Sequence, residues 1–291
     1  DILTRVSKGL CMSQFQEPEN VDLAEVPPTP FRGSRKAWAI HLLILGAYPL
    51  MMAAMSVFSS GGDGGAALSP SLPQLFMVVA SELVLFAVWF GAAWGFSGVS
   101  FHQLMFRLNH LVLTPIYGFL YSVGLRFGVG VVMVITLIAV AGLSGGNLSE
   151  IAEDFRPDIE KVVDTDHLES DSTYLIVNCT VVSFVLAGFR EELWRVGMIA
   201  GLFALFPKLD TSIWGRLGAV ASVALLFGLG HAVQGAGAVW LTFLLGLGLG
   251  GIIVFHRSIW EAVIAHGFFD ASTFVMIFVI KRYFPDAIPG F

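Results

Sequence analysis

The sequence predicts an all-α, polytopic bundle of transmembrane helices that crosses the membrane seven or eight times. The mean hydropathy is +0.78, and 56% of the 291 residues are hydrophobic whereas only 13% are charged. These values are typical of a membrane protein and not of a soluble globular one. Windows of roughly 20 apolar residues, the length that a spanning helix needs, recur along the chain. An integral, multi-pass protein surrounded by the lipid bilayer is therefore expected.

The chain starts with a polar segment, 1–36, which contains the sequence EVPPTP. No periodic apolar face is present there, so this segment is expected to be a flexible tail or linker. Residues 37–291 are expected to form one transmembrane helical domain. An acidic loop at 144–173 interrupts that domain.

Seven apolar windows predict the spans of this domain. The second window carries only Glu82 and the third only Arg126. The fourth window is long enough for two helices broken near Gly188, so both seven and eight spans remain open. The windows are 37–59, 74–96, 113–142, 174–206, 217–233, 236–255 and 258–280.

The distribution of charge predicts the orientation. Five basic residues precede the first window, and the loop after that window, SGGDGGAALSPSLP, has none. The positive-inside rule therefore places the N-terminus in the cytoplasm, as in a bacterial-type cytoplasmic membrane. Between Glu150 and Asp171, nine acidic residues stand against Arg156 and Lys161, and this loop is expected to be solvated on the outer side. No nucleic-acid partner is expected.

The decapeptide GFREELWRVG, residues 188–197, places four charges inside the fourth apolar window. A charge at membrane depth costs about 2.5–3.5 kcal/mol on insertion scales, and such groups usually face the bundle interior or a wet cavity. If the segment is helical, Arg195 is four residues after Glu191 and three after Glu192. Either pair can meet on one face. One carboxylate is then left without this partner.

Two later windows supply further polar groups. The sequence FGLGH places Phe227 and His231 one helical turn apart, and HGFFD places His266 and Asp270 on one face. A single buried histidine is most often a hydrogen-bonded core residue, but several such segments together predict a shared site. A carboxylate and an imidazole can deprotonate a water or ligate a metal that activates it. A second imidazole with a hydrogen-bonding partner can stabilise an oxyanion, so the set favours hydrolysis.

In order and context these residues resemble the three motifs of the CPBP intramembrane metalloproteases: EExxxR, FxxxH, and HxxxN or HxxxD. This family includes the type II CAAX prenyl endopeptidases and bacterial bacteriocin-processing and self-immunity proteins. The resemblance covers roughly residues 75–280. It implies a bundle of about eight helices and an intramembrane peptidase whose substrate is a membrane-embedded or lipidated peptide.

The resemblance also implies roles for single residues. Glu191 with His231 would activate the water, and His266 with Asp270 would form the oxyanion hole. Glu192 would be part of the acidic pair and would form a structural ion pair with Arg195. A zinc ion held by Glu191, His231 and His266 is one alternative and a site without metal is the other, because two histidines with carboxylates are an incomplete zinc ligand set.

One spacing departs from the family pattern. The family has its arginine four residues after the second glutamate, but Arg195 comes three residues after Glu192. Either the arginine is displaced by one position, or Arg190 occupies the first acidic position. The first interpretation is preferred because it keeps Glu191 and Glu192 as the acidic pair. Which of them is the base stays open.

Other charged and small residues receive structural interpretations. Glu82 and Arg126 are expected to pair across the bundle, and Glu261 is expected to be an anchor at the membrane interface. The glycines of GLGLGG are expected to allow close helix packing through Gly246 and Gly250, because no strand precedes them as a nucleotide loop would need.

A non-enzymatic protein is the alternative function. The same polar residues could serve structurally in an immunity factor or scaffold, or form an ion path in a transporter subunit.

Overall fold

The computed structural model describes residues 33–59 and 71–284, and no strand occurs within these ranges. The all-α prediction is confirmed. The predicted tail, as far as residue 32, and most of the loop after the first span lie outside the described residues. The expectations about them stay predictions.

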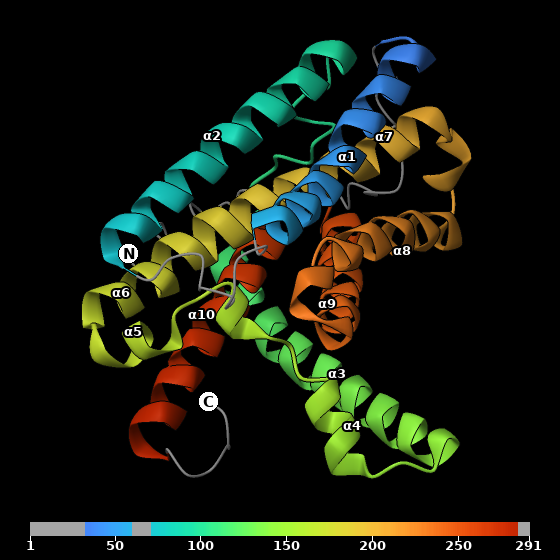
Figure 1. The fold of residues 1–291 in the computed structure, drawn as a ribbon. Helices are drawn as coiled ribbons and strands as arrows, with labels where there is room; N and C mark the ends of the chain where they lie inside the picture. Colours follow the sequence, from blue (N-terminus) through green and yellow to red (C-terminus); the bar gives the residue numbers. More distant parts are fainter. Residues whose placement is uncertain (1–32, 60–70, 285–291) are drawn as a thin grey trace, which may run out of the picture. The chain divides into compact units, whose positions relative to one another are not determined.

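Seven long helical segments overlap the seven apolar windows, although α8 (Ile213–Leu229) begins and ends four residues before the fifth window (Figure 1). The fourth is composed of three consecutive pieces that run without interruption from residue 172 to residue 205. The segments are α1 (Arg35–Ser59), α2 (Leu72–Ser97), α3 (Leu113–Ser144), α6 (Ser172–Val177) continuing through η2 (Asn178–Glu191) into α7 (Glu192–Leu205), α8 (Ile213–Leu229), α9 (Ala236–His256) and α10 (Trp260–Tyr283).

Five of these segments are long and apolar enough to cross a membrane: α2, α3, 172–205, α9 and α10. α8 is a shorter apolar helix. Short helices occupy the connections. They are α4 (Leu148–Asp154), η1 (Ile159–Lys161) and α5 (Thr165–Ser170) in the acidic loop, and η3 (Pro207–Leu209) and η4 (Ala232–Gln234) on either side of α8.

The fourth segment is not broken near Gly188. Its middle, η2, is instead a π-helix of 14 residues, a wider form that is rare and often found at functional sites. The packing between α10 and η2 is more extensive than that between any other two elements that the structure describes. A Cβ atom on Gly188 would lie 2.8 Å from the carbonyl oxygen of Val263, so glycine is needed for this close approach of α10.

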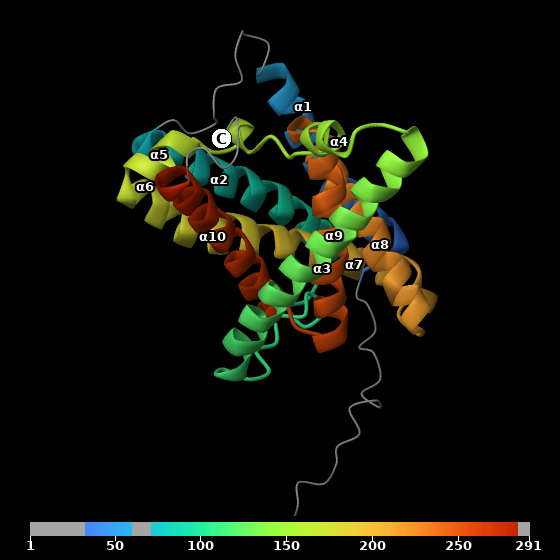
Figure 2. The same cartoon turned by 90° about the horizontal axis from the view of Figure 1, so that it is seen from below.

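Contacts between the connections show that the chain alternates between two ends of the bundle. At one end, Ile259 donates a backbone hydrogen bond to Met105. At the other end, Asp158 donates one to Gln234, and Lys281 at the end of α10 pairs with Asp166 of the acidic loop. Figure 2 shows α4, α5 and the end of α10 at the same edge. This alternation is the one that seven consecutive spans require.

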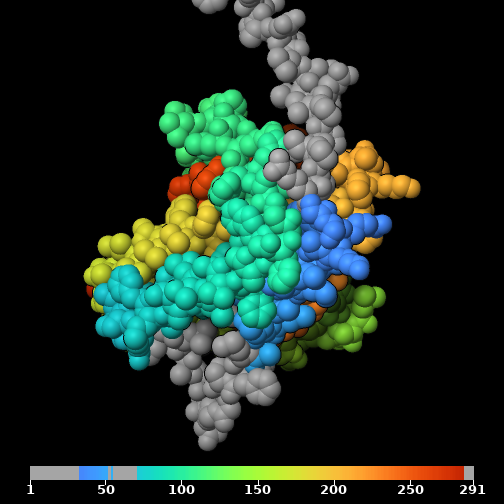
Figure 3. Space-filling model, turned by 90° about the horizontal axis from the view of Figure 1, so that it is seen from above, coloured from blue at the N-terminus to red at the C-terminus, as the bar shows by residue number. Residues whose placement is uncertain are grey.

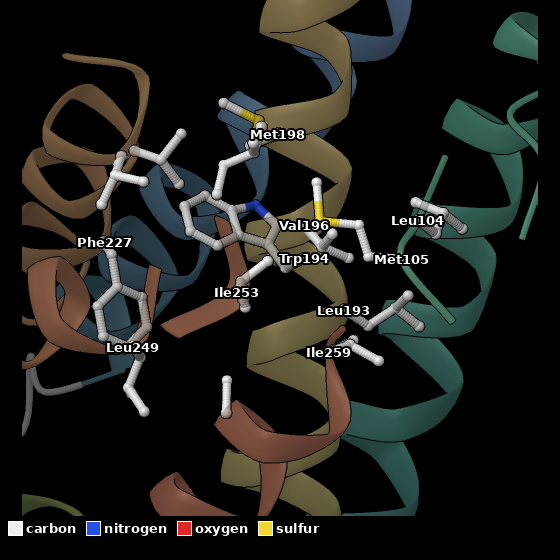
Figure 4. Close-up of a cluster of buried hydrophobic side chains, with 14 of the residues drawn as sticks. Leu104, Met105, Leu193, Trp194, Val196, Met198, Phe227, Leu249, Ile253 and Ile259 are labelled. Atoms are coloured by element: carbon white, nitrogen blue, oxygen red, sulfur yellow. The ribbon is translucent and has the colours of Figure 1, made fainter. Parts of the chain in front are cut away.

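The core is built around α7, in which eleven of the twelve positions from Glu192 to Phe203 are buried. Trp194 points toward Phe227 of α8, with 6.1 Å between the ring centroids, and Leu193 points to the opposite side of the helix (Figure 4). A Cβ atom on Gly197 would lie 2.8 Å from Leu45, so α1 also packs closely here. α7 is therefore a buried helix with neighbours on several sides.

Small residues bring α8 and α9 together as the glycine pattern predicted. A Cβ atom on Gly246 would lie 3.1 Å from Ala224, and one on Gly250 would lie 2.7 Å from Val220. The prediction of close helix packing is confirmed.

Other faces of the bundle expose large apolar side chains. Phe127 and Leu143 on α3 and Val84 and Val88 on α2 are strongly exposed, and Figure 3 shows α2 lying beside α1 on one such face. Apolar exposure over whole helices is expected where lipid tails, and not water, contact the protein.

Candidate functional site

The candidate site lies where the π-helix η2 changes into the α-helix α7. Glu191 is the last residue of η2, and Glu192 is the first residue of α7. His266 and Asp270 lie one turn apart on α10, which packs against η2. Two sequence segments about 75 residues apart therefore meet at the site.

The innermost part of the site is an ion pair between Glu192 and Arg195. The side chains are 0% and 1% exposed, respectively, and Nη1 of Arg195 donates to Oε1 of Glu192. Nδ1 of His266 lies 2.8 Å from the same oxygen. Because an ionised carboxylate only accepts hydrogen bonds, Nδ1 carries the hydrogen. Glu192 therefore fixes the orientation of the His266 ring and leaves Nε2 to face the rest of the site.

Arg195 also contacts α8 through an aromatic ring. Its Cζ atom lies 4.4 Å from the centroid of Phe227, a distance suited to a cation–π interaction. Nε and Nη2 of Arg195 are buried and have no hydrogen-bond partner among the described residues. The arginine is thus held by one carboxylate and one ring face, and it joins α7 to α8.

Two carboxylates approach the other nitrogen of His266. Oε2 of Glu191 lies 3.9 Å from Nε2, and Oδ2 of Asp270 lies 3.7 Å from it. Both distances are too long for direct hydrogen bonds, although catalytic contacts are often loose before a substrate binds. Glu191 and Asp270 are 18% and 27% exposed, so this side of His266 is more open than the Glu192 side.

Arg190 holds Glu191 from the opposite direction. Its Nη2 lies 2.9 Å from Oε1 of Glu191, and its Nη1 donates to Oε2 of Glu82 on α2. The predicted pairing of Glu82 with Arg126 is therefore wrong. The spacing within a helix identifies which residues share a face, but it does not identify the neighbouring helix that this face contacts.

Arg126 instead connects α3 to α10. It donates to the hydroxyl oxygens of Ser272 and Thr273 at 2.7 and 2.9 Å, and its Cζ lies 4.3 Å from the ring centroid of Phe269. These contacts fix the turn of α10 that contains Asp270.

Among the described residues, His231 is not joined to the other candidate residues by a hydrogen bond or an ion pair. It follows α8, where its Nδ1 is 2.9 Å from the carbonyl oxygen of Phe227 and its ring centroid is 4.8 Å from that of Phe227. Within residues 71–284, no ion pair or hydrogen bond of His231 to Glu191 or His266 is present. The Phe227 ring, which contacts both His231 and Arg195, connects His231 to the buried ion pair.

The three zinc ligands predicted from the sequence are not grouped as a metal site in the described part of the structure. In the part of the chain that the structure describes, no group of three or more His, Cys, Asp or Glu side chains could hold a metal ion. Glu191, His231 and His266 belong to that part, and the described contacts of His231 do not reach the other two. Zinc binding by them stays a prediction.

Two further polar residues are buried between helices. Glu261 is not the exposed interface anchor that the sequence predicted. It is 1% exposed in the first turn of α10, and Thr114 donates to its Oε1 at 2.9 Å. His41 is buried between the carbonyl oxygens of Ala93 and Gly197. Both residues join helices and lie outside the candidate site.

A scan against protein-family models matches residues 173–272 to the family described as "Type II CAAX prenyl endopeptidase Rce1-like". This segment is Rce1-like. The resemblance inferred from the three motifs is confirmed, because the Rce1-like segment extends from α6 to the middle of α10 and contains Glu191, His231, His266 and Asp270. The family implies a membrane protease. Searches of curated proteins and of solved structures give no significant match.

Proposed function

We propose that the Rce1-like segment hydrolyses a peptide bond in a membrane-embedded or lipidated peptide, using a water activated at Glu191. The observation that carries this proposal is the approach of Glu191 and Asp270 to the same nitrogen of His266, within two candidate membrane spans and on the more exposed side of the ring. Groups that can accept a proton and stabilise negative charge are the minimum that hydrolysis requires.

In the proposed reaction, Oε2 of Glu191 takes a proton from the water while the water oxygen attacks the carbonyl carbon of the substrate. The carbonyl oxygen becomes an oxyanion, and a hydrogen on Nε2 of His266 is placed to stabilise it. Asp270 stabilises the positive charge of His266. Glu191 then returns its proton to the leaving amine as the tetrahedral intermediate collapses and the C–N bond breaks. Glu192 and Arg195 keep the His266 ring oriented throughout.

His231 is proposed as a second imidazole acting on the water, a role that comes from the family resemblance. The structure supports a role for His231 less directly than one for His266, because the His231 side chain contacts Phe227. No step here depends on a metal. The zinc content of the purified protein tests the zinc prediction separately.

The test is a turnover assay on the full chain in detergent. The probe is a quenched fluorogenic peptide that carries an S-farnesyl cysteine before its last three residues, compared with the same peptide without the farnesyl group. Turnover is expected for the wild type and is expected to be lost in Glu191→Ala and His231→Ala. Asp210→Asn, which removes a carboxylate from a loop ion pair, is the matched control. Unchanged turnover in both site variants would overturn the proposal.

An ion path is the second candidate, favoured by a row of charged groups across several helices. Glu82, Arg190, Glu191, His266 and Asp270 follow one another at ion-pair distances from α2 to α10. Such rows line proton pathways in transporters. Proton flux into liposomes containing the protein, with no turnover of either peptide, would favour this function over hydrolysis.

The proposed orientation places the N-terminus of α1 in the cytoplasm. Arg35 at the start of α1 donates to Leu205, and the connections at that end contain Arg107, Lys208 and Arg257, whereas the acidic loop lies at the opposite end. This asymmetry agrees with the positive-inside rule. Reporter fusions placed after residue 208 and within the acidic loop are expected to report opposite sides of the membrane.

A further inference from the structure

Arg190 lies beside the candidate site but belongs to none of the three motifs. Its guanidinium group contacts carboxylates on two different segments, Glu82 on α2 and Glu191 at the end of η2. Its Nε is buried without a hydrogen-bond partner among the described residues. The two carboxylates are thus the ion-pair partners that hold this arginine in place.

We propose that Glu82 and Arg190 form a positioning pair that fixes the carboxylate of Glu191. This inference rests on the proposed function, in which Glu191 is the base. Arg190 occupies Oε1 of Glu191 at 2.9 Å, and Oε2 is the oxygen that faces His266. A free glutamate side chain loses rotamer entropy when it adopts one orientation. An arginine already in place supplies that order before the substrate binds.

Glu82 sets how Arg190 approaches Glu191. A guanidinium group commonly binds one carboxylate with two parallel hydrogen bonds, and this geometry would engage both oxygens of Glu191. Because Glu82 accepts from Nη1 of Arg190, only Nη2 contacts Glu191. Oε2 of Glu191 therefore stays available on the side of His266. The planar fork of arginine can serve two carboxylates in this way, whereas the single ammonium group of lysine cannot reproduce its geometry.

The test measures kcat and KM separately for Glu82→Gln and Arg190→Lys, with the farnesylated fluorogenic peptide as the probe. A pair that orients the base and does not bind substrate changes kcat with little effect on KM. We expect kcat to fall at least ~10-fold in each variant and KM to change less than ~3-fold. The matched controls are Asp210→Asn and Arg257→Lys, which alter the loop ion pair between Asp210 and Arg257. Their kcat is expected to stay within ~2-fold of the wild type.

Chemical rescue separates positioning from a merely structural role. Arg190→Ala is assayed with added guanidinium ion and, as a control, with tetramethylammonium ion at the same concentration. Guanidinium, which can donate to both carboxylates, is expected to restore part of kcat, and tetramethylammonium, which has no N–H group, is not. Thermal unfolding in detergent is followed for every variant.

Wild-type kcat in both Glu82→Gln and Arg190→Lys would overturn the inference. So would a loss of kcat that guanidinium does not restore and that parallels a loss of thermal stability. Failure of the proposed function gives different results: the wild type shows no turnover, or Glu191→Ala keeps unchanged turnover. Turnover that needs Glu191 but neither Glu82 nor Arg190 rejects the positioning pair alone.

Discussion

Two arginine–glutamate pairs lie within six consecutive residues, and they differ in how much water reaches them. Glu192 and Arg195 are 0% and 1% exposed and contact only the interior of the bundle. Arg190 and Glu191 are 12% and 18% exposed, and they share their charges with Glu82 and approach His266. The same two residue types therefore have different roles in the two pairs. Glu192–Arg195, here called the dry pair, joins helices and orients the ring of His266. Arg190–Glu191, here called the open pair, presents a carboxylate that can exchange protons.

The largest expected effect comes from breaking the dry pair. Arg195→Leu removes the cation and leaves the fully buried Glu192 with His266 as its remaining partner. We expect a loss of about 3–5 kcal/mol in the free energy of unfolding. Denaturant unfolding in detergent measures it. Arg216→Leu, which breaks a one-third exposed ion pair with Asp210, is the control and is expected to cost less than about 1 kcal/mol. Equal losses in the two variants would contradict the distinction based on burial.

Neutralising the open pair is expected to affect turnover instead of folding. Glu191→Gln keeps the size of the side chain but removes the proton acceptor, and we expect turnover to fall at least ~100-fold. The unfolding free energy should change by less than about 1 kcal/mol, because Glu191 is partly exposed. If Glu192→Gln abolished turnover in a stably folded protein while Glu191→Gln remained active, the assignment of the base would be reversed.

A smaller effect tests how the buried arginine is held. Phe227→Leu keeps an apolar side chain but removes the ring below Arg195. We expect a loss of about 1–2 kcal/mol in unfolding free energy, from the cation–π interaction of a desolvated cation. Phe269→Leu is the matched variant, since Arg126 lies at a similar distance from Phe269 but is less buried. Because Arg195 is more buried than Arg126, Phe227→Leu is expected to lose more unfolding free energy than Phe269→Leu. Unfolding of both variants under the same conditions measures the two losses.

The smallest effect lies outside the membrane, at Asp164, which caps α5 in the acidic loop. Partial burial acts to raise the pKa of the Asp164 carboxyl, but hydrogen bonds from the backbone and side chain of His167, aided by the backbone of Asp166, outweigh it. The pKa therefore lies below its ordinary value. A lowered pKa in the folded state contributes stability above the unfolded value, near 4, and this contribution is lost as the pH falls through the folded value.

Asp164→Asn isolates this charge because asparagine can also cap a helix. At pH 7 the variant is expected to be less stable than the wild type by under about 1 kcal/mol. Thermal unfolding between pH 7 and pH 3 should show the two proteins converging as the pH drops below 4. A difference that does not shrink between pH 7 and pH 3 would mean that the effect does not come from the charge of Asp164.

The spans could be predicted from sequence because the bilayer imposes one requirement on all of them. Each needs about 20 apolar residues, so the hydropathy windows overlap the helices, with bounds that differ by a few residues. The π-helical form of η2 could not be predicted. Hydropathy does not distinguish a π-helix from an α-helix, and the close packing of α10 against Gly188 is a contact between residues that are distant in the sequence.

The site could be predicted in part for a related reason. Spacing within one helix correctly indicated that Glu192 can meet Arg195 and that His266 can face Asp270. Partners on different helices depend on how the helices rotate and pack, and no pattern in this single sequence gives that information. Glu82 was therefore assigned to Arg126, whereas the structure pairs it with Arg190.

The unequal lengths of two helical segments have a consequence for the surrounding lipid. α8 has 17 residues and is about 25 Å long, whereas the 34 residues of 172–205 extend over roughly 50 Å. The hydrocarbon layer is about 30 Å thick. A flat slab cannot match both lengths: a long segment tilts or extends beyond the hydrocarbon layer, and the lipid beside a short helix becomes thinner. His231 lies two residues after the end of α8, so thinner lipid beside α8 brings the aqueous boundary closer to this histidine.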